Sequence, residues 1–158
     1  AFMAINIVLV EPEIPQNTGN IIRTCACTNA VLHLIKPLGF SMDEKHMRRA
    51  GLDYIDLVKI NIYEDFADFE NKNPGADCHL FSTKSQKNHY DAEYNDGCYL
   101  IFGKETKGLS KEILEKYPEG MVRIPMVNED RIRSLNLSNS VAVAVYEAIR
   151  QIGPENMR

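Results

Sequence analysis

Residues 134–149 read SLNLSNSVAVAVYEAI, and this stretch decides more about the fold than any other part of the chain. The alternating Val and Ala of its second half would suit a strand as well as a helix. Three signals favour a helix: its length, a polar start at Asn136 or Ser138 that can act as N-cap, and a stop at Gly153-Pro154. We therefore expect a long C-terminal helix that follows a polar loop.

The apolar residues of this expected helix lie on more than one side. One stripe is formed by Val141, Val145, Ala148, Ile149 and Ile152, and further apolar surface by Val143, Ala144 and Tyr146. A helix with two apolar sides usually packs against a different partner on each side. Here one side would pack against the sheet of its own subunit and the other against a second subunit. A well-capped helix in the core of one subunit explains the same pattern, so both interpretations stay open.

The N-terminal part predicts a strand, a helix and a second strand. The two apolar runs that read as buried strands are residues 5–10 and 31–35. Between them, the proline-rich stretch 11–15 should be a loop that cannot be helical, and residues 17–28 should form a helix capped by Asn17 or Thr18. Strand, helix and strand in this order indicate a parallel sheet with right-handed crossovers.

The remaining elements extend the same α/β pattern. Further strands are expected at residues 57–62, 78–83, 97–102 and 121–124, and further helices at residues 43–50, 63–71 and 110–117, the last capped by Ser110. The prediction is a single α/β domain over residues 1–158, a parallel sheet flanked by helices. We expect Met3 to be the natural start and Ala1-Phe2 to be an added remnant.

Composition excludes several classes of protein. With 158 residues, 44% apolar and 25% charged, the chain is typical of a globular protein, and no apolar run approaches the length of a membrane span. The four cysteines form no C-x-x-C pair, so we expect reduced thiols, no metal site and a cytoplasmic location. The net charge of −4 argues against general nucleic-acid binding.

Three polar loops follow expected strands, at residues 17–23, 103–108 and 134–139. In open parallel sheets ligands bind at the carboxyl ends of strands, so these loops are the candidate site. Residues 103–108 are not a P-loop, because no Ser or Thr follows Lys104, and the chain has no G-x-G-x-x-G. The two most common nucleotide sites of α/β domains are thus disfavoured.

Together the three loops resemble the motifs of the SPOUT superfamily of S-adenosylmethionine-dependent RNA methyltransferases, in its small 2′-O-methylating branch. Motif one, N-x-G-x-x-x-R, matches residues 17–23, and motif two, F-G-x-E-x-x-G, matches residues 102–108. Motif three matches Ile124-Pro125-Met126 with residues 134–139. Each motif alone is weak, but three in order at strand ends are a strong signal.

The segments 11–20, 34–40 and 48–54 narrow this resemblance to the TrmL type, and it covers essentially the whole chain. It implies a C-terminal trefoil knot, a homodimer, S-adenosylmethionine as cofactor without a metal, and no membrane. The implied reaction is methylation of the ribose 2′-hydroxyl of the wobble nucleotide, cytidine or modified uridine, in certain leucine tRNAs. One departure is residues 128–133, which read as an insertion of about two residues and put any role of Arg131 or Arg133 in doubt.

The resemblance also implies roles for residues. Arg23 would act on the 2′-hydroxyl, and because a guanidinium stays protonated we expect it to hold a phosphate or stabilise the developing alkoxide. The other implied catalytic residues, which would brace the loops and orient Arg23, are Asn17, Ser138 and Asn139. The implied cofactor-binding residues are Phe81, Thr83, Gly103, Glu105, Gly108, Ile124, Met126, Ser134 and Leu135. Candidate tRNA contacts are Lys36, Arg48 and Arg49.

Two other functions remain open at this point. A SPOUT base methyltransferase would carry similar motifs, although Arg23 and the Ser-Asn pattern favour ribose as the acceptor. A non-catalytic module on the same fold would bind RNA or the cofactor without turnover. For most of the residues named above, capping, turn or core roles are the alternative interpretation.

Overall fold

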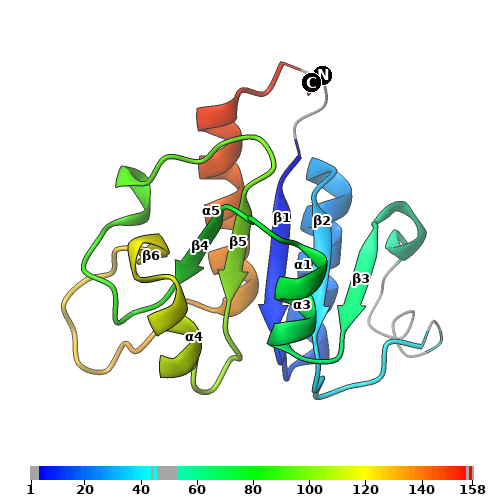
Figure 1. Ribbon diagram of the computed structural model, residues 1–158, viewed down its shortest axis with the longest axis horizontal. Coiled ribbons are helices and arrows are strands. Elements are labelled where there is room, and N and C mark those ends of the chain that lie inside the picture. Colours follow the sequence, from blue (N-terminus) through cyan, green and yellow to red (C-terminus); the bar gives the residue numbers. More distant parts are fainter. Residues whose placement is uncertain (1–3, 44, 46–52, 156, 158) are drawn as a thin grey trace.

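The computed structural model describes residues 4–43, 45, 53–155 and 157 and contains a six-stranded, entirely parallel sheet (Figure 1). The strand order is β3-β2-β1-β5-β4-β6. The strands are β1 (Asn6–Val10), β2 (Val31–Ile35), β3 (Ile60–Tyr63), β4 (Cys78–Phe81), β5 (Tyr99–Phe102) and β6 (Met121–Val122). The predicted α/β class with a parallel sheet is confirmed.

Helices cover both faces of this sheet (Figure 1). The α-helices are α1 (Pro15–Thr28), α3 (Phe66–Lys72), α4 (Lys111–Lys116) and α5 (Leu137–Ile152), and short 3-10 turns are η1 (Ile55–Leu57), η2 (His89–Asp91) and η3 (Pro118–Gly120). One core cluster joins the sheet to α1 and α5, and the other joins it to α3 and α4. Because both faces are covered, the central strands are mostly apolar, and their polar exceptions are Asn6, His33 and His79.

The C-terminal helix forms as predicted. Asn136 is its N-cap, and its side-chain oxygen accepts from the backbone N–H of Ser138 at 2.9 Å. Gly153 ends it. Its last turns are less polar than expected, since Glu147 is buried and forms an ion pair with Arg150 at 2.8 Å. The predicted cap of α4 is also confirmed, because Ser110 accepts from the N–H of Ile113.

The predicted start of α1 was wrong. The helix begins at Pro15, whose fixed φ and missing N–H suit the first helical position, so the stretch 11–15 is not all loop. Asn17 and Thr18 lie inside the helix and are buried, and the N-cap position, Ile14, has no side chain that could cap. The N–H groups of Glu13 and Ile14, just before the helix, find their acceptor elsewhere in the chain, as described below.

Several strand boundaries also differ from the prediction. The strand expected at 57–62 is a 3-10 turn, η1, followed by the shorter β3, and β4, β5 and β6 are each shorter than predicted. The segments just after β4 and β6 leave the sheet because they form the loops of the candidate site. Most of the helix predicted at 43–50 lies outside the described residues. The knot stays a prediction.

Cys25 and Cys27, both on α1, have different surroundings. Cys25 is buried and Cys27 is exposed, and burial raises the pKa of the Cys25 thiol to about 12, which keeps it protonated. Within residues 4–43, 45, 53–155 and 157, no group of His, Cys, Asp and Glu could hold a metal ion. Nor does any helix in those ranges have the length and apolar character to cross a membrane.

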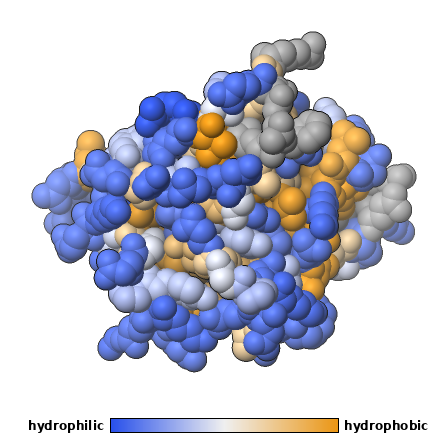
Figure 2. Space-filling model, turned by 45° about the horizontal axis from the view of Figure 1, so that its top comes forward, coloured by the Kyte–Doolittle hydropathy of each residue, from blue (hydrophilic) through white to orange (hydrophobic). Residues whose placement is uncertain are grey.

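The face in Figure 2 is mostly hydrophilic, and apolar side chains break it chiefly on the right of the view. In Figure 1 that side of the molecule carries β3. Ile62 of β3 and Leu57 before it are among the exposed apolar residues. Both described ends of the chain lie at the top of Figure 1, opposite the carboxyl ends of the strands, where the motif loops gather.

Candidate functional site

A cavity of about 430 Å³ opens at the carboxyl ends of β4, β5 and β6, and all three motif loops contribute to its wall. We call it the motif cavity. All nine predicted cofactor-binding residues line it: Phe81, Thr83, Gly103, Glu105, Gly108, Ile124, Met126, Ser134 and Leu135. Of the predicted catalytic residues, Asn17 lines it and Arg23, Ser138 and Asn139 do not.

Two aromatic rings form the apolar part of this cavity. Phe81 at the end of β4 and Phe102 at the end of β5 are neighbours in register, and their rings stack with centroids 4.6 Å apart and planes 16° apart. Both are almost fully buried. Adjacent to them, the backbone N–H groups of Ile124 and Met126 donate to no acceptor among the described residues. The cavity thus combines an apolar surface with unpaired peptide groups, as ligand sites do.

Glu105 of motif two joins two of the loops. Its carboxylate accepts from the backbone N–H of Glu13 and of Ile14, both at 2.8 Å, and from the side-chain amide of Asn17 at 3.2 Å. A carboxylate is the best acceptor for N–H groups at the positive end of a helix. Glu105 therefore fixes the chain where it enters α1, by binding the N–H groups of the two residues before Pro15, from about 90 residues away in sequence.

Glu13 forms a reciprocal contact with the motif-two loop. Its carboxylate accepts from the backbone N–H of Thr106 at 3.0 Å and from the Thr106 hydroxyl at 2.8 Å. These hydrogen bonds hold the pKa of Glu13 below its usual value. The two segments 11–14 and 104–106 are also joined by an ion pair between Lys104 and Glu11 at 3.5 Å. The loops after β1 and β5 are thus fixed to each other in both directions.

Asn17 extends this connection to the third motif. Its side-chain oxygen accepts from the amide of Asn136 at 3.2 Å, and the oxygen of Asn136 accepts in turn from the N–H and hydroxyl of Ser138 and from the N–H of Asn139. One hydrogen-bonded chain, which we call the motif network, therefore runs from Glu105 through Asn17 to Asn136 and the start of α5. Ser138 and Asn139 shape the first turn of α5 rather than the cavity wall.

Gly103 is required by its own loop. A Cβ there would collide with the backbone of Gly108 and Leu109, because the loop turns back and its Lys104 and Gly108 pair as an antiparallel bridge. Gly108 itself has φ of +69°, in the left-handed region that favours glycine. Gly103 was implied only as a cofactor-binding residue, and the structure shows that the backbone of its own loop also requires a glycine there.

Glu13 and Thr106 were not among the predicted site residues. Glu13 lies in the stretch 11–15, which was interpreted only as a stiff loop, and its partner is 93 positions away. The usable signal was chemical: an acidic residue directly before a helix that lacks a local cap needs a donor. Nothing in the spacing indicates that Thr106 is that donor.

Arg23 stands apart from the motif network. It is exposed on α1, and its guanidinium carbon lies 5.3 Å from the centroid of the Tyr54 ring, a cation–π arrangement. The structure therefore does not bring Arg23 together with the other predicted catalytic residues within one copy of the chain. Lys36, a candidate tRNA contact, forms an ion pair with Glu64 at 3.2 Å, while Arg48 and Arg49 lie outside the described residues.

Comparison with known proteins gives a consistent result. Residues 4–146 match the model of the SpoU rRNA Methylase family. The tRNA (cytidine(34)-2′-O)-methyltransferase of Escherichia coli K12 is 51% identical over 151 residues, which cover 94% of each chain. Its counterpart in Burkholderia cenocepacia is 49% identical over 154 residues, 95% of this chain and 97% of the relative.

Solved structures agree with the sequence matches. One solved structure, described as concerning the 2-OH methylation of C/U34 on tRNA, is 43% identical in sequence to this chain and superposes on it with a TM-score of 0.88. The match covers 94% of this chain and 96% of the chain in that structure. The family model spans most of the chain, and the identities extend over nearly its whole length. The chain therefore belongs to the SpoU rRNA methylase family.

Proposed function

We propose that this protein transfers a methyl group from S-adenosylmethionine to the ribose 2′-hydroxyl of nucleotide 34 of tRNA, a cytidine or a modified uridine. Relatives about 50% identical over nearly the full length carry this activity in their names. Leucine tRNAs are the expected substrates, and the cytoplasm, where tRNA is modified, is the expected location.

The observation that carries the proposal is the motif network. Three loops far apart in sequence meet around one cavity, and Glu105, Asn17 and Asn136 hold them in a single hydrogen-bonded chain. Methyl transfer from a sulfonium needs mainly accurate placement of the methyl group in line with the attacking oxygen. A rigid junction of three loops is suited to that task.

The residues of the motif cavity fit an adenosine. The rings of Phe81 and Phe102 offer apolar surface for a purine, and the free N–H groups of Ile124 and Met126 can bind the polar edge of the base. When bound, S-adenosylmethionine supplies an electrophilic methyl group. The chain itself would hold the nucleoside, exclude water and fix its orientation.

Arg23 would act on the tRNA rather than on the cofactor. Because it stays protonated, its guanidinium can hold a phosphate or stabilise the developing alkoxide of the ribose, and the proton would leave to phosphate or water. Within one copy Arg23 does not line the motif cavity. We therefore propose that a second copy supplies it, so that the working enzyme is a homodimer.

Exposed apolar residues near the site support a dimer. On α5, Val143 is 37% exposed and Tyr146 is 51% exposed, while Ile14 and Leu135 are exposed beside the motif cavity. Scattered apolar residues are normal, but these lie on the helix whose second apolar side predicted a partner. A second copy covering α5 would bury them.

The direct test is methyl transfer from labelled S-adenosylmethionine into bulk bacterial tRNA, followed by digestion to nucleosides and identification by mass. Label in 2′-O-methylcytidine or a 2′-O-methylated uridine is the expected result. Label in a base would overturn the ribose assignment in favour of a base methyltransferase. Cofactor binding without any label, in tRNA from a strain lacking this activity, would favour the non-catalytic module.

The role and origin of Arg23 have a separate test. Arg23→Ala should lower methyl transfer by about 10²–10³-fold, the usual cost of losing one charge-stabilising group, and leave cofactor affinity unchanged. Loss of both activities together would show that Arg23 serves the cofactor or the fold.

Mixing variants tests the dimer. Leu135→Arg should fill the motif cavity, and alone it should be as inactive as Arg23→Ala. If each site combines a cavity from one copy with Arg23 from the other, equal mixing should restore about a quarter of wild-type activity, since half the dimers are mixed and each has one intact site. No recovery despite exchange of subunits, followed by mass or light scattering, would contradict a shared site.

A further inference from the structure

A second cavity, of about 570 Å³, lies beside the motif cavity. We call it the side cavity. It lies between the loop after β4, residues 83–88, and the segment 123–133 after β6, and it shares Thr83, Met126 and Arg133 with the motif cavity. Apart from Pro125 of motif three, none of the residues that only the side cavity contains belongs to a motif. Any ligand there would be in contact with a ligand of the motif cavity.

The backbone around the side cavity is fixed by pairing. Asn88 and Arg123 form a parallel bridge, in which the N–H of Arg123 donates to the carbonyl of Lys87 and the N–H of His89 donates to the carbonyl of Arg123, both at 2.8 Å. The side-chain oxygen of Asn88 accepts from the N–H of Tyr90, so its amide N–H₂ remains free to donate. The positions of Asn88 and Arg123 are therefore set before any ligand arrives.

The cations at this place lack carboxylate partners. Among the residues that the structure describes, Lys84, Lys87, Lys107, Arg123 and Arg133 form no ion pair, and Lys84, Lys107 and Arg133 line the motif cavity while Arg123 and Arg133 line the side cavity. Outside the two cavities Lys36, Lys72, Lys111, Lys116, Arg131 and Arg150 each have a carboxylate within 4 Å, as does Lys104, which lines the motif cavity. Unpaired cations around two joined cavities favour an anionic ligand.

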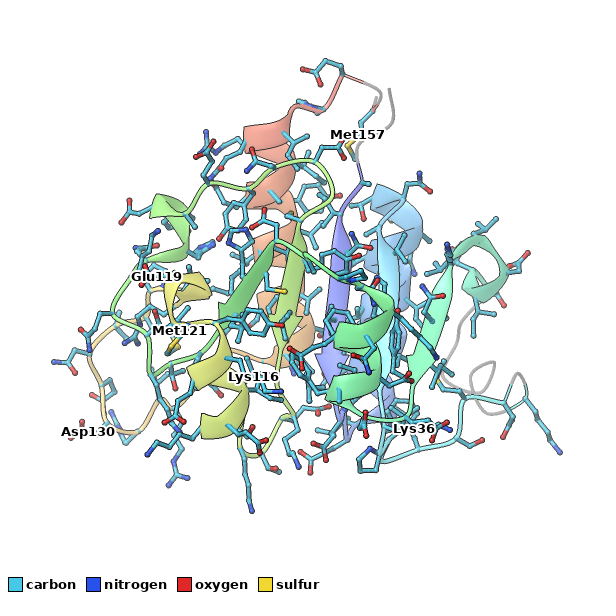
Figure 3. The ribbon with its side chains drawn as sticks, in the orientation of Figure 1. Lys36, Lys116, Glu119, Met121, Asp130 and Met157 are labelled. Atoms are coloured by element: carbon cyan, nitrogen blue, oxygen red, sulfur yellow. The ribbon has the colours of Figure 1, made fainter. Side chains whose placement is uncertain are left out.

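The side cavity is also lined by two acidic residues, Glu129 and Asp130, and Glu129 has a cationic partner of its own. Glu129 accepts from the side chain of Arg131 at 2.9 Å, and this hydrogen bond holds the pKa of Glu129 below its usual value. Asp130 lies at the outer edge of the loop, away from the sheet (Figure 3). Arg123, by contrast, is only partly exposed and follows directly on β6. Its backbone is held by the bridge to Asn88, so the fold fixes the position from which its side chain extends.

We propose that the side cavity binds a nucleotide of the substrate RNA next to the one that is methylated. Arg123 and Arg133 would hold its phosphate, and the amides of Gln86 and Asn88 would face the edge of its base. This inference rests on the proposed function, since it adds a second RNA subsite to the same site. An RNA loop whose bases are unstacked can place one nucleotide at the cofactor and the neighbouring nucleotide in such a cavity.

The charge pattern favours RNA over other anions. A free phosphate or a carboxylate would need one or two cations, whereas Lys84 and Lys107 continue the unpaired positive charge along the wall of the adjoining motif cavity. Phosphates spaced along a chain would use such a row. A chain with net charge −4 would then bind RNA through this one surface rather than generally.

The test compares two variants of matched chemistry. Arg123→Gln removes a cation of the side cavity, and Lys59→Gln removes an exposed lysine before β3, at the other end of the strands and the opposite edge of the sheet. Binding of bulk bacterial tRNA is measured without cofactor at several salt concentrations, and binding of S-adenosylhomocysteine serves as the control for folding.

For Arg123→Gln we expect tRNA affinity to fall about tenfold, the size of one charge-assisted hydrogen bond, and the salt dependence to lose about one counterion. Arg123→Lys should keep the salt dependence and regain part of the affinity. Lys59→Gln should behave like the wild type. Unchanged tRNA binding by Arg123→Gln, with cofactor binding intact, would overturn the proposal.

Methyl transfer by the same variants separates this proposal from the function itself. If the wild type methylates tRNA and Arg123→Gln has a normal KM for tRNA, the side cavity is not an RNA subsite while the proposed function stands. If the wild type binds tRNA through Arg123 but transfers no methyl group, the subsite stands and the proposed function fails.

Discussion

Two polar networks each join parts of the chain that are distant in sequence, and they differ in where they lie and what surrounds them. The first, around His33, is buried on the face of the sheet covered by α3. The second is the motif network at the carboxyl ends of the strands. Both consist of ordinary neutral and charge-assisted hydrogen bonds, so bond chemistry alone does not distinguish a structural network from a functional one.

The His33 network is closed. One ring nitrogen of His33 bonds to the Tyr63 hydroxyl at 2.8 Å and the other to the side-chain oxygen of Asn6 at 2.9 Å. Asn73 donates to the Tyr63 oxygen and accepts from the Tyr99 hydroxyl. Phe69 packs against the rings of His33, Tyr63 and Tyr99. Neither the motif cavity nor the side cavity is lined by these residues.

The motif network opens onto a cavity. Its members Glu105, Asn17 and Asn136 line that cavity and satisfy one another, yet next to them lie free peptide N–H groups and unpaired cations. Buried networks that satisfy all their members stabilise one packing arrangement. Where a network with all its hydrogen bonds formed borders groups that lack a partner, it instead fixes the positions at which those groups can bind a ligand. The comparison predicts that the first network controls stability and the second controls activity.

The largest expected effect on stability is that of pH on His33. Burial, and to a lesser degree the charge of Lys59, lowers its pKa from 6.5 to about 4. The unfolded chain therefore takes up the proton first as pH falls, so this contribution to stability is complete above pH 6.5 and is lost between about pH 6.5 and 4. The loss is at most about 3 kcal/mol.

Urea unfolding at a series of pH values checks this. His79 and His89 are shifted in the same direction by burial, so the wild type is compared with His33→Gln, which keeps one donor and one acceptor. The variant should show a smaller loss of unfolding free energy between pH 6.5 and 5. An identical slope would mean that His33 is not the group that titrates.

Glu105→Gln tests the opposite region. The amide keeps the size of the side chain but replaces one acceptor oxygen, so one of the contacts to Glu13, Ile14 or Asn17 is lost and the loops shift. Misplacement of this kind can lower kcat/KM by about 10²-fold. Glu119→Gln, at an exposed glutamate outside both cavities, is the matched control. Comparable activity of the two variants would show that the motif network does not position the site.

The smallest effect is expected for Tyr63→Phe. Removal of the hydroxyl leaves His33 and Asn73 each without one partner in a buried place, at a cost of about 1.5 kcal/mol in unfolding free energy. Methyl transfer should be unchanged when measured well below the melting temperature. A loss of activity beyond the loss of folded protein would break the distinction between the two regions.

Much of the fold could be predicted because the signals are local. Alternation and apolar runs placed the strands, and Ser110 and Asn136 were predicted as caps because a helix start needs a side-chain acceptor close in sequence. The nine cofactor-binding residues taken from the resemblance all line the motif cavity, since the motifs follow strands whose carboxyl ends must meet at one edge.

What could not be predicted depends on contacts between distant segments. Asn17 was expected to cap α1, but it lies inside the helix and its side-chain amide donates to Glu105, and no rule of spacing connects residues 88 positions apart. The pairing of Glu13 with Thr106 has the same origin. Arg23 was expected near the other catalytic residues, and its place on the exposed side of α1 follows from helix geometry that the motif alone does not specify.

The measurement that tests the central claim most directly is calorimetric titration of S-adenosylmethionine into the wild type and into Leu135→Arg. Leu135 is exposed and lines the motif cavity, so an arginine there should block the cavity without cost to folding. We predict saturable one-site binding by the wild type and none by the variant, with unchanged melting temperature in the absence of ligand. Equal binding by both proteins would place the cofactor outside the motif cavity and contradict the account.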